Sequence, residues 1–417
     1  MKGCLVASSR AAINAIATAG KRQPPIEIEP DPSTFLLAFC GSGTGHMTQA
    51  IALVRLLQAK GMTLGGVVTD TDMPQRLLDE VVMPLGVPLL VLPAITLVTK
   101  SGVLPPHRLL LKACAVDRGL AKEDGRIREF LAKSRAALFI NMWQISLGKF
   151  LALRPLPPSV RVLHIAAQCG QARGSTLAHS TGDLPPFREP VSMLAATAAK
   201  GTVEAMCSLF AESGALIPIH AAGGVAGSAS LAPIIDIPEA LQPGGKPLLL
   251  CYFLTQAPAR ALERLLHRHP IEGWEVHVFT PEALKTPRGR TLSLESHPKE
   301  RRLFQELFAR CTAVCCSTGN ETIWEAVCRG VPVLTIPTFQ HGEQIMNAVA
   351  HARALPHLVR TRMKLRIADV RWLTSFEQTD ESRQESAGLR ERCAGVAEGL
   401  DRVLAGPYEA PVIIEKM

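Results

Sequence analysis

The sequence lacks any hydrophobic run long enough to cross a membrane as a helix. The best candidate, residues 86–98, falls short of the roughly 18 residues that a spanning helix requires, and Pro88 and Pro93 interrupt it. Aromatic residues are scarce, at 5% of the 417 residues, yet 47% are hydrophobic and 20% are charged. This composition excludes a disordered or fibrous chain and predicts a globular protein of roughly two or three domains.

The sequence also lacks CxxC pairs, although it contains 11 cysteines. An odd number of cysteines without a CxxC pair fits neither a disulfide framework nor a zinc site. We therefore expect reduced, mostly buried thiols in a cytosol-like compartment.

Acidic residues are absent from the first 26 positions. Half of the formal net charge of +8 comes from four basic residues ahead of Glu27, namely Lys2, Arg10, Lys21 and Arg22. The remaining +4 is ordinary for this length, which argues against a nucleic-acid partner. An organelle transit peptide, a disordered basic tail and a cloning remnant all fit residues 1–32. We expect a cytoplasmic protein and keep organellar targeting as an alternative.

Apolar strand-like runs alternate with helical stretches along nearly the whole chain. That alternation is typical of parallel sheets covered by helices on both faces, so we predict the α/β class. A Pro- and Gly-rich stretch at 237–246 separates two such series. The first series has runs at 35–39, 65–70, 88–92, 137–142, 160–166 and 216–219, and the second at 247–253, 275–279, 313–316 and 333–337.

Because the second series restarts the first, we expect two Rossmann-like domains that face each other across a cleft. We assign residues 33–237 to an N-terminal domain, 238–246 to a linker and 247–385 to a C-terminal domain, with a C-terminal helix and tail at 386–417. Open sheets of this kind bind ligands outside the carboxyl ends of their strands. Function should therefore lie in the cleft, beside a long loop predicted at 170–190.

A Gly-rich turn, GSGTGHMTQA at 41–50, connects the first strand to an amphipathic helix. Glycines permit a sharp turn and close ligand approach, and the helix start offers free N–H groups. No Lys-Ser/Thr pair follows, which excludes a P-loop, and His46 replaces the third glycine of a dinucleotide-binding motif. Asp70, which ends the second strand, keeps a nicotinamide cofactor open as a minor alternative. His46 faces the expected cleft, as a general base or as a packing histidine.

A second motif, CCSTGNETIWEA at 315–326, follows a strand of the second series and closes with Gly-Val-Pro. Thr318 and Glu321 have capping-box spacing, which predicts a helix that begins at about Gly319 and presents its N–H groups to an anion. Glu325, one turn later, would accept hydrogen bonds from ribose hydroxyls beyond a bound diphosphate. The alternative is that both acids only favour the helix dipole.

A third motif follows the strand at 333–337. Glu343, Gln344 and Asn347 lie within one helical turn, which gathers a carboxylate and two amides at another strand end that faces the cleft. Such groups suit sugar hydroxyls.

Together these motifs resemble those of GT-B glycosyltransferases. The Gly-rich turn with His46 is similar to the first glycine loop of the peptidoglycan N-acetylglucosaminyltransferase family, glycosyltransferase family 28, and its glycolipid-forming and UDP-glycosyltransferase relatives. The run 317–325, with Gly-Val-Pro, Pro337 and the stretch 339–348, resembles the nucleotide-sugar signature of their C-terminal domain. The resemblance spans residues 33–405.

The resemblance implies a hexosyltransferase that moves a sugar from a nucleoside diphosphate donor, with uridine as the expected base, to an acceptor hydroxyl. It implies an inverting reaction without a metal or another cofactor, with His46 as the catalytic base. The first glycine loop, formed by Gly41, Gly43, Thr44 and Gly45, would lie near the acceptor. The donor would contact Ser317, Thr318, Gly319, Asn320, Glu321, Glu325, Phe339, Gln340, His341, Glu343, Gln344 and Asn347.

The sequence departs from the family at residues 254–258, where Leu-Thr-Gln-Ala-Pro replaces a turn in which relatives place Gly and Ser on phosphate. The acid that would hold His46 is one of Asp70, Asp72 and Asp183. Two other functions stay open, a nucleotide-sugar epimerase or hydrolase of the same fold and a catalytically silent nucleotide-sugar-binding subunit. The acceptor, a small molecule or a lipid, is not defined.

Two further patterns lie toward the C-terminus. Basic and apolar residues alternate from Arg360 to Ile367, which predicts a half-exposed strand with a basic face. A solvated face explains that pattern, and a peripheral contact with a lipid membrane is the alternative. An apolar stripe must also cover one of the two domains; its members are Leu389, Cys393, Val396, Leu400 and Val403.

Overall fold

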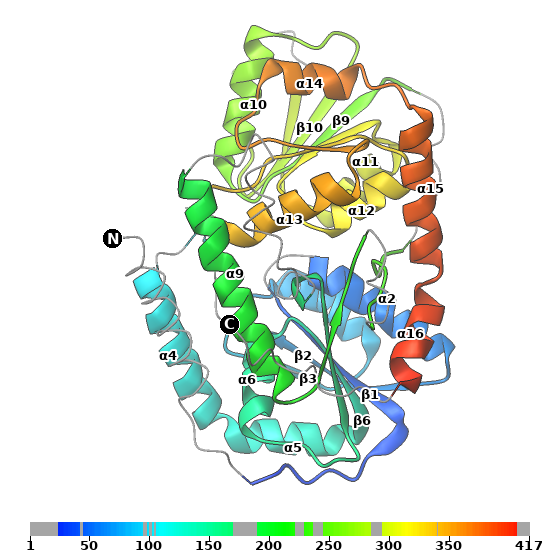
Figure 1. The fold of residues 1–417 in the computed structure, drawn as a ribbon. Helices are drawn as coiled ribbons and strands as arrows, with labels where there is room; N and C mark the ends of the chain where they lie inside the picture. The colour runs from blue at the N-terminus through cyan, green and yellow to red at the C-terminus, as the bar shows by residue number, and fades with distance from the viewer. Residues whose placement is uncertain are drawn as a thin grey trace.

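Two six-stranded parallel sheets form the framework of the protein (Figure 1). The computed structural model describes residues 24–41, 45–94, 98–99, 102–103, 106–169, 190–221, 229–236, 245–284, 294–339 and 341–406. The strand orders are β3-β2-β1-β6-β7-β8 and β11-β10-β9-β12-β13-β14. In both sheets the chain starts at an inner strand and crosses over first to one side and then to the other, as in Rossmann domains. The predicted α/β class with two Rossmann-like domains is confirmed.

The N-terminal sheet has helices on both faces, and β1 is accordingly buried without a break over its last six residues. Its strands are β1 (Asp31–Phe39), β2 (Thr63–Asp70), β3 (Leu89–Leu92), β6 (Ala136–Met142), β7 (Arg161–Ala166) and β8 (Ala215–Pro218). Its helices are α2 (Gly45–Ala59), α3 (Gln75–Leu77) with the turns Leu78–Val82 and Met83–Leu85, α4 (Pro106–Lys122), α5 (Asp124–Ser134), α6 (Ile145–Leu153) and α9 (Pro190–Ala211). A short antiparallel pair, β4 (Val98–Thr99) and β5 (Gly102–Val103), stands apart.

The C-terminal sheet repeats this plan. Its strands are β9 (Leu248–Tyr252), β10 (Glu275–Thr280), β11 (Leu294–Pro298), β12 (Ala313–Cys316), β13 (Val333–Thr335) and β14 (Val359–Thr361). Its helices are α10 (Gln256–Arg268), α11 (Arg301–Arg310), α12 (Glu321–Cys328), α13 (Gly342–Ala354) and α14 (Ile367–Thr374), followed by α15 (Asp380–Ala394) and α16 (Val396–Ala405). The sequence did not predict β11, whose residues LESHP carry no apolar run.

The C-terminal helices return to the N-terminal domain, and the apolar stripe is divided between them. α15 packs on α12, whereas α16 lies beside the lower domain (Figure 1). The Arg161 guanidinium on β7 donates to the carbonyl oxygens of Val403 at 2.5 Å and Gly406 at 3.1 Å, at the end of α16. Carbonyl groups left without partners at a helix end are thus satisfied by the other domain. The chain end therefore ties the two domains together.

The predicted half-exposed basic strand from Arg360 to Ile367 is wrong. β14 ends at Thr361, and Ile367 already begins α14. Arg360 stacks on Trp372 with 4.2 Å between the guanidinium carbon and the ring centroid, and Arg362 forms a 2.8 Å ion pair with Asp369. Both cations are therefore engaged with α14, and the alternation reflects this packing rather than a pleated strand.

Two further properties of the described residues are the state of their cysteine thiols and the apolar character of their helices. Ten described cysteines are free and eight of them are buried. No described helix combines the length and the apolar character needed to cross a bilayer.

Candidate functional site

Helices α2 and α12 meet where the carboxyl edges of the two sheets face each other. The Gln49 side chain on α2 donates to the Glu321 carboxylate, the first residue of α12. A Cβ on Gly45, the first residue of α2, would lie 2.0 Å from the Glu321 carboxylate oxygen. This carboxylate therefore lies against the start of α2, where an acid is favoured by the helix dipole.

The first glycine loop begins in a place that only glycine can occupy. The Gly41 amide donates to the Asp70 carboxylate at 3.1 Å. A Cβ on Gly41 would lie 2.5 Å from the Asp70 carboxylate and 2.6 Å from the Met73 amide nitrogen, which is too close for any other residue. Gly43 and Thr44 lie outside the described residues. His46, the second residue of α2, is half-buried beside this turn.

Asp70 holds Gly41, at the start of the glycine loop. Besides Gly41, its carboxylate accepts from the Asp72 amide at 3.1 Å and from the Gln144 side chain at 3.2 Å. Burial raises the pKa of the Asp70 carboxyl, although the amide hydrogen bonds from Gly41 and Asp72 oppose the rise. Of the three acids considered for His46, Asp183 lies outside the described residues. Asp70 joins β1, β2 and the start of α6 rather than standing open for a ribose.

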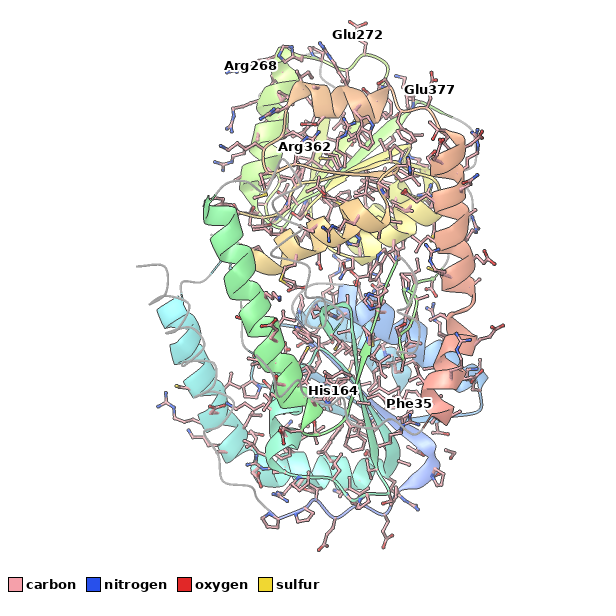
Figure 2. All side chains as sticks on the ribbon, viewed as in Figure 1. Phe35, His164, Arg268, Glu272, Arg362 and Glu377 are labelled. Carbon is pink, nitrogen blue, oxygen red and sulfur yellow. The ribbon has the colours of Figure 1, made fainter. Side chains whose placement is uncertain are left out.

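A buried polar network continues from Asp70 along the N-terminal sheet. Asn141, near the end of β6, accepts from the Gln144 amide at 2.7 Å and lies 3.0 Å from the His164 ring. Gln144 also caps α6 by accepting from the Leu147 amide. Burial lowers the pKa of His164 to about 3, so this ring is neutral. Figure 2 shows His164 inside the domain, which supports a structural role.

Trp143, between β6 and α6, adopts a left-handed conformation with φ of 61°. Such a conformation costs a tryptophan roughly 1–3 kcal/mol and persists only when the surroundings enforce it. Its ring meets Phe210 edge-on at 5.4 Å, and Met346 from α13 belongs to the same buried cluster. The strained turn therefore borders the contact between the domains. Sequence reasoning missed the Asn141–Gln144 turn, although one amide at the end of a buried strand and a second just after it were a usable signal.

The predicted capping box at the second motif is wrong. α12 begins at Glu321 rather than Gly319, with Asn320 as the preceding residue, and no side chain caps it. The Thr318 hydroxyl has no hydrogen-bond partner among the described residues. Asn320 instead bonds the His351 ring at 2.9 Å, and Glu321 turns toward Gln49. Contacts with α13 and with the other domain outweigh the local capping pattern.

The loops after β12 and β13 are held by α13, while one threonine hydroxyl in each loop stays unpaired among the described residues. The Asn347 side chain donates to the Thr318 carbonyl at 3.3 Å, and the Gln344 side chain accepts from the Thr338 amide at 2.7 Å. The buried hydroxyls of Thr318 and Thr338 have no partner within the part of the chain that the structure describes. Buried polar groups are normally satisfied, so two unpaired hydroxyls on adjacent loops indicate a place for a ligand.

The neighbouring backbone is also accessible. Gly319 is exposed, and a Cβ placed on it would meet nothing within 4 Å. Ser317 accepts from the Leu254 amide at 3.0 Å, which joins this loop to the turn after β9. That turn is the departure from the family pattern, and the contact keeps it against the second motif. Phe339, after β13, is 60% exposed and offers an aromatic face.

Glu325 lies half-buried on α12, one turn after Glu321. Burial raises the pKa of its carboxyl to about 8, and the negative charges of Glu321 and Asp236 add to the rise against the opposing effect of Arg301 and Arg329. The group is therefore mostly protonated near neutral pH. A protonated carboxyl can both donate to and accept from a hydroxyl.

Glu343 makes a second bridge between the domains. Its carboxylate accepts from the Gln168 side chain, just after β7, at 2.7 Å. The side-chain carbonyl oxygen of Gln168 (Oε1) is buried and has no partner among the described residues. His341 caps α13 by accepting from the Gln344 amide at 3.4 Å, and burial lowers its pKa. Gln340 lies outside the described residues.

Lys299, which sequence reasoning missed, is a cation near the carboxyl edge of the C-terminal sheet. It follows β11 directly, and its ammonium nitrogen lies 5.3 Å from the centroid of the Tyr252 ring at the end of β9. The residue keeps an exposed surface, and partial desolvation of the ammonium group by its neighbours lowers its pKa to about 8. Its position beside the turn after β9 places a positive charge near the loops that carry Ser317 and Leu254.

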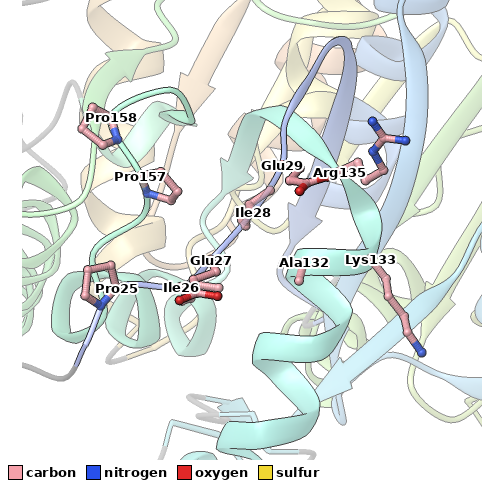
Figure 3. A pocket seen from close by; sticks show the side chains of 10 residues that line it. All are labelled: Pro25, Ile26, Glu27, Ile28, Glu29, Ala132, Lys133, Arg135, Pro157 and Pro158. Carbon is pink, nitrogen blue, oxygen red and sulfur yellow. The ribbon is translucent and has the colours of Figure 1, made fainter.

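The described surface also has a hollow at the opposite end of the N-terminal domain. It has a volume of about 890 Å³ and lies at the amino ends of the strands (Figure 3). Its walls come from the segment before β1, the end of α5 and the turn before β7, and its lining residues include Ile26, Glu29, Lys133, Arg135 and Pro157. Because α/β sheets bind ligands at their carboxyl ends, we place the candidate site at the interdomain junction and not in this hollow.

Known structures share this two-domain arrangement. A UDP-glucosyltransferase from Polygonum tinctorium, described as glucosylating indoxyl, matches with a TM-score of 0.60 and 14% identity over 89% of this chain and 98% of its own. The calicheamicin glycosyltransferase CalG4 matches with a TM-score of 0.56 and 16% identity over 90% and 98%. MurG of Acinetobacter baumannii matches with a TM-score of 0.51 and 15% identity over 89% and 99%.

Sequence comparison adds nothing to this result, because neither a protein-family profile nor a curated protein matches the chain. The likeness therefore concerns the fold. The chain has the GT-B fold, as the resemblance of its motifs implied.

Proposed function

We propose that the protein is a glycosyltransferase that transfers a sugar from a nucleoside diphosphate donor to an acceptor hydroxyl. The observation that carries the proposal is the pair of unpaired buried hydroxyls, Thr318 and Thr338, on adjacent loops at the carboxyl edge of the C-terminal sheet. The exposed Gly319 backbone lies in the same loop as Thr318. A donor that bonds both hydroxyls removes the cost of leaving them unsatisfied.

The polar and aromatic side chains near the carboxyl edge of the C-terminal sheet each suit one part of such a donor. The Thr318–Gly319 loop and the Lys299 cation suit the diphosphate, since backbone N–H groups and a cation both favour an anion. Glu325 suits the ribose hydroxyls, and Glu343 with its amide neighbour Gln168 suits the sugar. The exposed ring of Phe339 offers an apolar face to the sugar or the base. Uridine is the base we propose, from the resemblance to UDP-glycosyltransferases.

The acceptor would bind on the N-terminal side, with His46 as general base. The acceptor oxygen attacks the anomeric carbon from the face opposite the diphosphate, and its proton passes to the His46 ring. The bond from the anomeric carbon to the β-phosphate oxygen breaks, and the nucleoside diphosphate leaves with the electron pair. This single displacement inverts the anomeric centre, and the protein's contribution is alignment and charge stabilisation without a metal.

Donor entry would require the two interdomain bridges to separate. Glu321 occupies the start of α2, and Glu343 is bonded to Gln168. Both acids would have to exchange these partners for the donor or for water. We therefore propose that the two domains open by a small amount before the donor binds and close again on it.

A silent donor-binding subunit is a second candidate, because the turn at 254–258 lacks the glycine that relatives place on phosphate. A nucleotide-sugar epimerase or hydrolase is the third. An assay that follows the donor sugar separates all three functions. An epimerase or hydrolase changes or releases the sugar without an acceptor, a transferase needs the acceptor, and a silent subunit binds nucleotide without turnover.

The first experiment is a thermal-shift panel of UDP, TDP, GDP, ADP and NAD with the wild-type protein, Thr318→Val and Glu325→Ala. A ligand at 100 times its dissociation constant stabilises the folded protein by about 2.7 kcal/mol, which is easily detected. Glu377→Ala is the matched control, because Glu377 is exposed at the periphery of the C-terminal domain (Figure 2). We expect one nucleoside diphosphate to shift the wild type and the control alike and to shift the two site variants less. A response to NAD alone would contradict the proposal.

A further inference from the structure

Three side chains capable of binding a metal share one face at the edge of the C-terminal sheet. His277 lies in the middle of β10, and Glu295 pairs with it directly on the edge strand β11. His297 is two residues beyond Glu295 and therefore points to the same face. We call these three residues the β10–β11 triad. Within the described part of the chain it is the group of His, Cys, Asp and Glu side chains whose ligand atoms gather closely enough for a metal ion.

The distances within the triad match those of a metal site. His277 Nδ1 and His297 Nε2 are 3.0 Å apart, and the Glu295 carboxylate oxygen is 3.7 Å from the first and 3.9 Å from the second. A point equidistant from the three atoms lies about 2.1 Å from each of them, which is the usual bond length from Zn²⁺ to imidazole nitrogen and carboxylate oxygen. The three side chains can therefore bind one ion without rearrangement of the strands.

The surroundings hold the ligands and leave the ion accessible. The His277 and His297 side chains are mostly buried, and their rings stack with 5.2 Å between centroids. The His297 ring also packs on Phe279 at 5.0 Å. The Glu295 side chain is 69% exposed, so an ion can reach the triad from solvent and keep a water molecule in a fourth position.

Two charged side chains outside the triad, Glu275 and Arg310, lie close enough to His277 to act on it electrostatically. Glu275 is engaged in a 2.8 Å ion pair with Arg310, so these two groups largely neutralise each other beside the triad.

We propose that the β10–β11 triad binds one divalent transition-metal ion of the Zn²⁺ type, with a water molecule as the fourth ligand. Two imidazoles and one carboxylate favour Zn²⁺ and its neighbours over Mg²⁺ and Ca²⁺, which prefer oxygen ligands. The triad lies on β10 and β11, whereas the unpaired hydroxyls of the proposed donor site follow β12 and β13. The metal would therefore fasten the edge strand and take no part in sugar transfer.

Fastening β11 has a consequence for the donor site. β11 ends at Pro298, and Lys299 follows it next to the ring of Tyr252. A metal bound by His277 and His297 joins β11 to β10 two residues before Lys299. It thereby stabilises the position from which this cation faces the donor loops.

The test is zinc binding by the whole chain without a histidine tag. Protein treated with a chelator and then freed of it is titrated with ZnSO₄ in competition with a chromophoric chelator. We expect one tight site per chain. His297→Ala and Glu295→Gln should each weaken it by more than the roughly 10–100-fold that loss of an outer-shell partner costs. MgSO₄ should not compete.

His269→Ala is the matched control, since His269 is an exposed histidine of the same domain, and it should bind zinc as the wild type does. Co²⁺ provides a second readout, because a four-coordinate cobalt ion with nitrogen ligands absorbs visible light and this absorption should vanish in His297→Ala. Glu295→Gln guards against misfolding, since it alters only an exposed carboxylate. Zinc binding that is absent in the wild type, or that is the same in His297→Ala, Glu295→Gln and His269→Ala, would overturn the proposal.

Discussion

The two halves of the molecule have the same strand order and different polar chemistry at the carboxyl edges of their sheets. In the N-terminal half, Asp70, Asn141, Gln144 and His164 bond one another and the backbone around them. In the C-terminal half, α13 holds the loops after β12 and β13 by their backbone and leaves two threonine hydroxyls unpaired. The polar groups around Asp70 are therefore largely bonded to one another, although the buried Thr69 hydroxyl and the Gln168 side-chain carbonyl oxygen have no partner among the described residues. The loops after β12 and β13 instead carry two unpaired hydroxyls on adjacent loops.

The first glycine loop and the loops after β12 and β13, where we propose that the donor binds, differ in how much space surrounds their glycines. Gly41 is enclosed by the Asp70 carboxylate and the Met73 backbone, so its place is set before any ligand arrives. Gly319 has open space beside it. Because an unsatisfied buried hydroxyl is costly, a ligand that bonds Thr318 and Thr338 would gain free energy at the C-terminal edge, whereas the Asp70 carboxylate is already bonded within the protein.

The largest expected effect is the loss of turnover when His46, the proposed base on the N-terminal side, is replaced. His46→Ala should lower turnover roughly 100- to 10,000-fold while nucleotide affinity is nearly unchanged, because a general base contributes by that factor to the rate and not to donor binding. Steady-state kinetics and a nucleotide titration measure the two effects separately. Turnover within twofold of the His269→Ala control would assign His46 a packing role, whereas nucleotide binding without turnover in the wild type would favour the silent-subunit alternative.

The next prediction concerns the buried hydrogen-bond network of the N-terminal domain, which includes Asn141, Gln144 and His164. Asn141→Ala should lower the free energy of unfolding by roughly 1–3 kcal/mol, because the Gln144 amide and the buried His164 ring each lose a partner. Chemical denaturation at pH 7 measures the change. An unchanged free energy of unfolding would show that these buried bonds are not what holds the N-terminal edge.

Thr318→Val is the corresponding substitution in the C-terminal half, and it should weaken nucleotide binding while leaving the stability of the protein nearly unchanged. Thr318→Val removes a hydroxyl that has no partner among the described residues, so the free energy of unfolding should stay within about 0.5 kcal/mol of the wild-type value or rise. The affinity for the stabilising nucleoside diphosphate should fall about tenfold, which is about 1.4 kcal/mol. If Thr318→Val destabilises the protein as much as Asn141→Ala does, the contrast between the two edges is lost.

The last prediction is a pH dependence of stability that arises at Glu325. Its carboxyl has a folded-state pKa of about 8, above the ordinary value of 4.5, so the folded protein binds the proton more tightly than the unfolded chain does. This contribution to stability is fully present below pH 4.5 and is lost as the pH rises toward 8. Glu325→Gln should therefore gain in melting temperature over the wild type as the pH rises from about 4.5 to 8. Parallel melting curves for the two proteins across this range would contradict the raised pKa.

The sequence predicted most inner strands and missed or misplaced the two edge strands of the C-terminal sheet. The inner strands β1, β6 and β9 carry continuous apolar runs because both of their faces are covered. β11 reads Leu-Glu-Ser-His-Pro and β14 has three residues, so neither carries enough apolar character for periodicity to reveal it. Short edge strands depend on the neighbour that they pair with.

The candidate site was predicted in part. The motifs located the loops after β1, β12 and β13, but the expected capping box between Thr318 and Glu321 did not form. The pattern has the correct spacing, yet Glu321 bonds Gln49 from the other domain instead. A local rule was overridden by a contact between residues 272 positions apart in the sequence.

By itself the sequence determined the alternation of strands and helices and the restart of that pattern in the second half, because these depend on local periodicity. Only the tertiary structure decided that Glu321 meets Gln49, that Glu343 meets Gln168, that His277 and His297 gather around one point and that the pKa of Glu325 is raised. These properties arise from burial and from contacts between distant segments. Their energies depend on distance and solvent exclusion, which the folded chain alone establishes.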